Sequence, residues 1–125
     1  MKESYVKNAF LNVADADKTS SLNLLDMNGS GRIKIFSVFF IPASSVINSF
    51  NSSKITLWDS DPGVSGQAFY QNRITSGTYN TYTDYRSANT LANFSPGGLV
   101  VECNDIYAQG GDDGICFVSI TYQGF

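Results

Sequence analysis

The sequence contains no histidine, and this absence removes several kinds of chemistry together. Histidine is the commonest general base, so Ser-His-Asp and Cys-His catalytic arrangements are excluded. Two cysteines without a histidine are also too few ligands for a zinc site. We therefore predict a protein that is not an enzyme and that holds neither a metal nor another cofactor.

Charged residues are scarce, and long hydrophobic runs are missing. Asp, Glu, Lys and Arg make up 15% of the 125 residues, and the net charge is -3. An acidic chain whose eight basic residues form no run is not expected to bind nucleic acid. The longest apolar run, 38–43, is far shorter than the roughly 20 residues of a membrane span, so we expect no membrane partner. Residues 1–8 lack the apolar core of a secretory signal.

Aromatic and β-branched residues are abundant instead, in short runs separated by Gly, Pro, Asn and Ser. These runs predict strands at 32–41, 54–59, 67–75, 99–107 and 115–122, with short apolar pieces at 22–26 and 90–94 and a stretch at 78–86 that fits a strand or an ordered loop. The pattern favours an all-β fold, a single antiparallel β-sandwich or jelly roll of about seven to eight strands. We assign this domain to residues 22–125 and expect residues 1–21 to form an N-terminal arm, which could become ordered on a partner. Within that arm, residues 5–14 fit a helix or a strand equally well.

The last 28 residues predict a β-hairpin around a Gly-rich turn at 108–114. Pairing Tyr107 with Cys116 places one apolar set on the inner face: Val101, Cys103, Tyr107, Cys116, Val118, Ile120 and Tyr122. The other face receives Glu102, Asn104, Ser119 and Thr121, with Val100, Ile106 and Phe117. In this register the two cysteines are offset by about 13 Å along the strands, which predicts free thiols rather than a disulfide.

The strand at 32–41 becomes apolar on both faces after its first residues. Such a pattern is typical of a central strand buried on both sides, or of one whose outer face meets a neighbouring subunit. The surplus of apolar side chains therefore gives a candidate subunit interface, composed of Phe36, Val38 and Phe40.

Acidic residues cluster in pairs at predicted turns, at 15 and 17, 59 and 61, and 112 and 113. Paired carboxylates can hydrolyse a glycoside or bind calcium, but none of these pairs has the rest of a calcium loop. Asp commonly caps turns, and this is the role we expect here.

A tyrosine-rich segment provides the candidate binding residues. Its spacing of three does not match strand alternation, so these side chains are not all expected to point inward. Tyrosine suits a sugar platform or a protein interface, although packing at sheet edges is an equally good interpretation. With the tryptophan upstream, the candidate set is Tyr79, Tyr82, Tyr85 and Trp58.

From residue 22 onward the order of strands and turns resembles the small β-sandwich proteins among the structural genes of tailed bacteriophages. The resemblance is carried by a strand from Ile33, by ITLWD at 55–59, by LANFSPGGLVV at 91–101, and by an acidic Gly-rich turn followed by VSITY at 118–122. The long Tyr/Thr-rich stretch at 76–90 departs from that pattern.

The resemblance implies a non-enzymatic virion structural protein, in capsid decoration, head-tail connection or the tail. Such a protein is synthesised in the host cytoplasm, forms a symmetric homo-oligomer and contacts other virion proteins. The alternative hypothesis is a carbohydrate-binding β-sandwich module that uses exposed tyrosines to bind a glycan.

Overall fold

The computed structural model describes residues 6–14, 17, 20–42, 52–75, 91–94, 97–112 and 115–124. Their regular elements are seven strands: β1 (Lys7–Asn12), β2 (Ser21–Pro42), β3 (Ser52–Trp58), β4 (Ala68–Thr75), β5 (Leu91–Asn93), β6 (Leu99–Asp112) and β7 (Ile115–Gly124). Every strand pairing is antiparallel, so the predicted all-β antiparallel fold is confirmed. Within this described part, no helix has the length and apolar character needed to cross a membrane.

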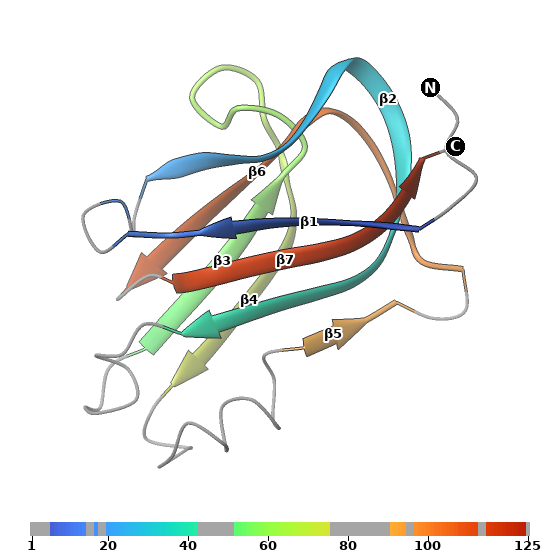
Figure 1. Ribbon diagram of the computed structural model, residues 1–125. Helices are drawn as coiled ribbons and strands as arrows, with labels where there is room; N and C mark the ends of the chain where they lie inside the picture. The colour runs from blue at the N-terminus through green and yellow to red at the C-terminus, as the bar shows by residue number, and fades with distance from the viewer. Residues whose placement is uncertain are drawn as a thin grey trace.

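The 22-residue strand β2 belongs to both layers of the sandwich. Residues 21–35 pair with β6, and residues 33–42 pair with β7. One layer, here called layer A, therefore runs β2-β6-β3-β4, and the other, layer B, runs β1-β7-β2-β5. Figure 1 shows β2 (blue to teal) bending sharply between its two halves, and β1 and β7 lying side by side across the strands of layer A.

The predicted hairpin between residues 99–107 and 115–122 is wrong, although both strands exist. Val101 pairs with Ile33 rather than with Tyr122, and Tyr122 pairs with Lys7 and Ile35. The physical reason is the length of β2, which satisfies the backbone groups of β6 along one half and those of β7 along the other. The two strands consequently lie in different layers and meet through their side chains instead of their hydrogen bonds.

The predicted inner face of these strands is correct in most positions and wrong at Ile106 and Tyr107, because Ile106 and Ala108 point into the core on either side of Tyr107. Val101, Val118 and Ile120 are buried as expected, but Ile106 is also fully buried. The alternation of inward and outward side chains along β6 changes phase between Cys103 and Ile106, because the register between β6 and β2 shifts by several residues there. A bulge of this kind changes which side chains point into the core without ending the strand.

A second irregularity in β2 overturns most of the predicted interface. The register with β7 shifts between Ile35 and Ser37, so the alternation changes phase at Phe36. Val38 and Phe40 are each 1% exposed and belong to the core, so neither can form a subunit interface. Phe36 itself is half-buried. The apolar side chains that face outward on this half of β2 are instead Phe39 and Ile41.

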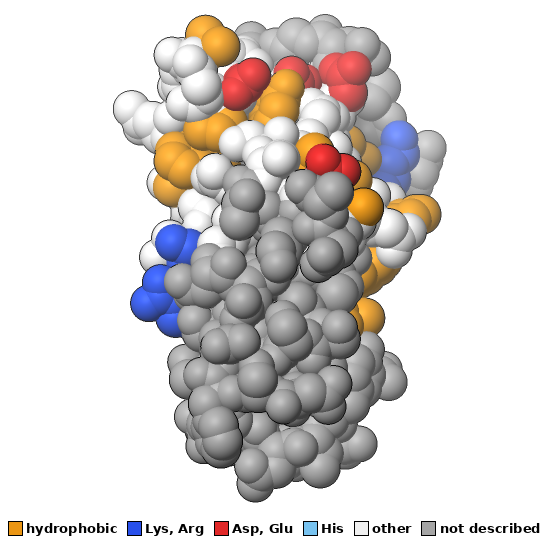
Figure 2. All heavy atoms as spheres, turned by 90° about the vertical axis from the view of Figure 1, so that its left-hand side faces the viewer, with side chains coloured by type: hydrophobic (Ala, Val, Ile, Leu, Met, Phe, Trp, Pro, Cys, Tyr) orange, Lys and Arg blue, Asp and Glu red, His pale blue; other side chains and the backbone are white. Residues whose placement is uncertain are grey.

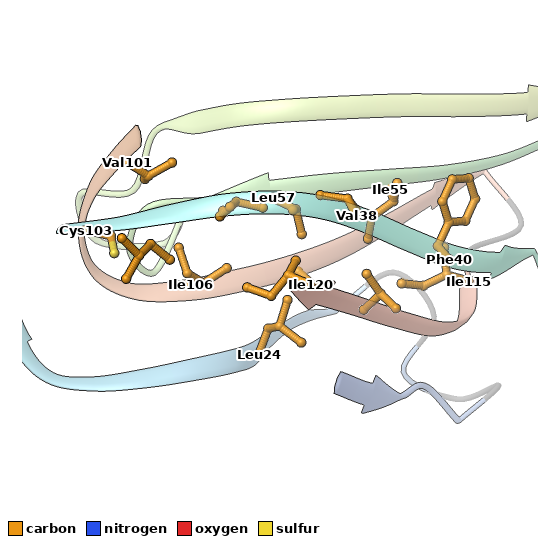
Figure 3. Close-up of a cluster of buried hydrophobic side chains, with 14 residues drawn as sticks. Leu24, Val38, Phe40, Ile55, Leu57, Val101, Cys103, Ile106, Ile115 and Ile120 are labelled. Atoms are coloured by element: carbon orange, nitrogen blue, oxygen red, sulfur yellow. The ribbon is translucent and has the colours of Figure 1, made fainter. Parts of the chain in front are cut away.

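The core fills the space between the two layers and contains side chains from β2, β3, β6 and β7. Figure 3 shows Val101 and Cys103 at one end of this cluster and Phe40 and Ile115 at the other. Tyr70 of β4 packs edge-on against Phe94, which follows β5, with ring centroids 5.7 Å apart. This contact joins layer A to layer B.

Part of the predicted N-terminal arm lies in the sheet. Residues 7–12 form β1, a strand and not a helix, and it pairs with β7 of the same chain. Ala9 and Leu11 pack against the core, while Asn8, Phe10 and Asn12 are exposed.

Candidate functional site

The outward surface of layer B is the first of two candidate functional sites in the described part of the chain. Residues paired across antiparallel strands share a face of the sheet. The registers of β1, β2, β5 and β7 therefore define this surface, the layer B face, by eleven outward positions within 8–12, 37–41, 91–93 and 117–121, and the next outward pair along β2 and β7, Lys34 and Gln123, borders it. The eleven are Asn8, Phe10, Asn12, Ser37, Phe39, Ile41, Leu91, Asn93, Phe117, Ser119 and Thr121. None of these side chains carries a charge, and all are half-buried or exposed.

Three aromatic rings form a cluster on the layer B face. Phe10 and Phe117 are stacked with centroids 6.0 Å apart and planes at 24°. Phe39 meets Phe117 at 6.2 Å with the planes at 61°. Phe10 is 62% exposed, and Leu91, the partner of Phe39 on β5, is 50% exposed. The cluster and Leu91 together therefore present apolar surface across four strands of one layer.

The second feature is a polar pocket of about 580 Å³ on layer A. Three segments line it: β2 at 31–32, β6 at 102–104 and the loop 59–67 that follows β3. Arg32 and Glu102 lie directly opposite each other on β2 and β6. The lining residues are Gly31, Arg32, Asp59, Ser60, Ser65, Gln67, Glu102, Cys103 and Asn104.

Hydrogen bonds fix the loop that forms one wall of the polar pocket. The Asp61 carbonyl accepts bonds from the backbone N–H groups of residues 64–66, and its carboxylate accepts one from Gly63 at 2.9 Å. The Asp59 carboxylate accepts a bond from the Gln67 N–H at 2.8 Å. An added Cβ at Gly66 would overlap the Ser60 carbonyl group, so the loop requires glycine there. The predicted turn-capping role is confirmed for Asp59 and Asp61.

The loop is also tied to β6. The Asn104 N–H donates to the Asp59 carbonyl oxygen at 3.1 Å, and the Met27 N–H donates to the Asp105 carboxylate at 3.0 Å. Hydrogen bonds therefore join β6 both to the loop 59–67 and to β2, the other two segments that line the polar pocket. Its described residues, like the rest of the described chain, contain no group of three His, Cys, Asp or Glu side chains that could hold a metal.

Cys103 lines the polar pocket as a free thiol with 5% of its surface exposed. Burial raises its pKa to about 11, with smaller contributions from the negative charges of Asp59 and Asp105. The thiol therefore stays protonated at neutral pH and is a poor nucleophile. The predicted free thiol is confirmed for Cys103, although the register on which we based it is wrong. The side chain of Cys116 lies outside the described residues.

The candidate binding residues are not brought together in the described part of the chain. Tyr79, Tyr82 and Tyr85 lie outside the described residues. Trp58 is half-buried, and its Nε1 atom is buried with no hydrogen-bond partner among the described residues. The polar edge of the indole is therefore not available at the surface.

Sequence reasoning missed both surfaces for different reasons. The alternation in KNAFLN, residues 7–12, was a usable signal for an exposed Phe10 beside an inward Leu11. The polar pocket has no comparable signal, because its walls come from segments about 30 to 70 residues apart in the sequence. Only the pairing of β2 with β6 brings Arg32 opposite Glu102.

Comparison with known proteins gives a match among solved structures and none among protein families. No family model and no curated protein matches the chain. Among solved structures, the chain is similar to the CBM32 of AlyQ in complex with 4,5-unsaturated mannuronic acid, at 18% identity and a TM-score of 0.33. That alignment covers 100% of this chain and 98% of the other.

Proposed function

We propose that the protein is a non-enzymatic structural subunit that associates with a second copy of itself through the layer B face. The observation that carries the proposal is the absence of charge at all eleven outward positions, together with the aromatic cluster in their midst. In an antiparallel sheet with one face in solvent, that face is normally composed of polar and charged side chains, which alternate along each strand with the buried apolar ones. Depletion of charge with enrichment of aromatic residues is typical of the centre of a protein interface.

A second copy suits the layer B face because of where the charge lies. The chain carries a net charge of -3, so contact between charged regions of two copies would bring like charges together. Figure 2, which looks at the molecule from the left-hand side of Figure 1, shows acidic side chains in the upper half of the view and Lys and Arg side chains at its flanks. Two layer B faces can approach without this repulsion, and a two-fold axis would place the same residues on both sides.

The setting we propose is the virion of a tailed bacteriophage, where the subunit would also contact other virion proteins. This part of the proposal rests on the resemblance of the strand and turn order given above. Mass spectrometry of purified particles of the encoding phage tests it directly. Detection of the protein at a fixed ratio to the major capsid protein is the expected result, and absence from the particles would reject the setting.

The self-association is tested by the native mass of the purified protein. We expect an oligomer for the unchanged chain and a shift towards monomer for Phe10→Ser, because that substitution removes the most exposed ring of the cluster. The matched control is Val64→Ser, an apolar side chain that is 82% exposed in the loop 59–67, outside the layer B face. A native mass that is monomeric in the unchanged chain, or equal in both variants, contradicts the proposal.

A further inference from the structure

The polar pocket has the size of a small-molecule site but not the usual lining. Its volume of about 580 Å³ falls within the range of roughly 300–1,000 Å³ found for ligand pockets. Such pockets are mostly lined by apolar and aromatic side chains. This one is lined by Ser60, Ser65, Gln67, Asn104 and three charged residues, Arg32, Asp59 and Glu102.

This lining narrows the chemistry of a ligand. A lipid or an aromatic molecule would meet more polar than apolar surface in the pocket. An anion would meet two carboxylates, on Asp59 and Glu102, against one guanidinium, on Arg32. A neutral ligand with many hydroxyl groups can use the full set, because the hydroxyl and amide side chains both donate and accept hydrogen bonds, the carboxylates accept, and the guanidinium donates.

The site is also organised before any ligand binds. The loop 59–67 is closed by the bond from the Gln67 N–H to the Asp59 carboxylate and is held against β6 by the bond from the Asn104 N–H. One Asp59 oxygen accepts that loop bond, and a carboxylate has further lone pairs for a ligand. A fixed loop reduces the ordering that binding would otherwise require.

From these observations we infer that the polar pocket binds one unit of a neutral saccharide, with Glu102 and Asn104 hydrogen-bonded to its hydroxyl groups. The pocket lies on layer A and shares no residue with the layer B face. The inference is therefore independent of the proposed self-association, and each can fail without the other.

The test is an NMR titration of the ¹⁵N-labelled protein with the methyl glycosides of glucose, galactose and mannose. We expect at least one of them to shift the amide signals of residues 59–67 and 102–104 in a saturable manner. Glucuronate, which carries a negative charge, and ethanolamine, a hydroxylated cation, serve as comparison probes. Glucuronate is expected to bind at least about tenfold more weakly than the neutral glycoside, because it meets two carboxylates.

Two variants locate the binding. Asn104→Ala and Glu102→Gln are each expected to weaken glycoside binding by about tenfold, since each removes or weakens a hydrogen bond in the pocket. The control is Arg73→Gln on β4, exposed and not part of the lining, which should leave binding unchanged. Saturable shifts with none of the three glycosides, shifts confined to other residues, or binding of ethanolamine alone would each overturn the inference.

Discussion

At the scale of single residues, Cys103 couples the stability of the fold to pH. Its pKa is raised from an ordinary value of 9.0 to about 11 in the folded chain, chiefly because the thiol is buried. The folded state therefore favours the protonated thiol. The resulting stabilisation is complete below about pH 9 and is lost as the pH rises towards 11.

We expect ionisation of this thiol to lower the free energy of unfolding by about 2 to 3 kcal/mol in total as the pH rises through this range. The measurement is urea unfolding at pH 8 and at pH 10.5, for the unchanged chain and for Cys103→Ala. The variant is less stable at pH 8 because of the lost side chain, but its stability should fall less between the two pH values. An equal fall in both proteins would show that other groups, such as tyrosines, cause the whole dependence.

Two neighbouring glycines at the start of β6 offer a matched pair of substitutions. Gly98 has a φ of 82°, and an added Cβ would lie 3.1 Å from the carbonyl oxygen of Ile35. An added Cβ at Gly97 meets no atom within 4 Å. We expect Gly98→Ala to lower the free energy of unfolding by about 1 to 2 kcal/mol, because the left-handed backbone disfavours a side chain.

Gly97→Ala is the control, and we expect it to leave the stability unchanged or to raise it by a few tenths of a kcal/mol. Thermal or urea unfolding of both variants decides the matter. Equal effects at the two positions would mean that the path of the chain into β6 does not depend on the conformation of Gly98.

At the scale of the elements, β1 is a structural strand and not only an arm. Its inward side chain Leu11 packs against the core, whereas the neighbouring Asn12 is exposed on the layer B face. We expect Leu11→Ala to cost about 1 to 2 kcal/mol in urea unfolding, less than a fully buried leucine, because Leu11 is half-buried.

The matched substitution Asn12→Ala should change stability by less than about 0.5 kcal/mol. If both variants unfolded like the unchanged chain, β1 would contribute little to the fold. Removal of β1 would then affect assembly alone, which is the behaviour expected of a detached arm.

At the scale of the whole molecule, the two proposed surfaces differ in how salt should affect them. The layer B face carries no charge at its eleven outward positions, so its contacts have no ion pairs to screen. We expect the native mass to be the same at about 0.05 M and about 0.5 M sodium chloride. Dissociation at the higher concentration would indicate an interface built from ion pairs, and would place it away from the layer B face.

Much of the fold could be predicted from local patterns. Period-two alternation located the strand at 54–59 almost to its ends, because side chains of a half-buried strand point alternately in and out, and the strand at 67–75 was also predicted almost to its ends. The turn role of Asp59 and Asp61 followed from residue types that bond to nearby backbone. These features depend on residues close together in the sequence.

The failures share a different cause. Val38 and Phe40 were assigned to an interface because we assumed that strict alternation continues beyond Phe36, which gives the strand two apolar faces. The register shifts at Phe36, so both side chains point into the same core as Ile33 and Ile35. The position of a bulge depends on how a strand fits its partner, and the sequence of β2 alone does not contain that information.

The amino-acid sequence by itself determined the all-β class, the approximate strand positions, the turn role of Asp59 and Asp61 and the absence of histidine. Only the tertiary structure decided which strands pair, because β6 and β7 are adjacent in sequence yet each pairs with β2. It likewise decided that Phe10, Phe39 and Phe117 share one surface and that Arg32 and Glu102 share one pocket. Local propensity acts over a few residues, whereas strand order depends on burying apolar faces that lie far apart along the chain.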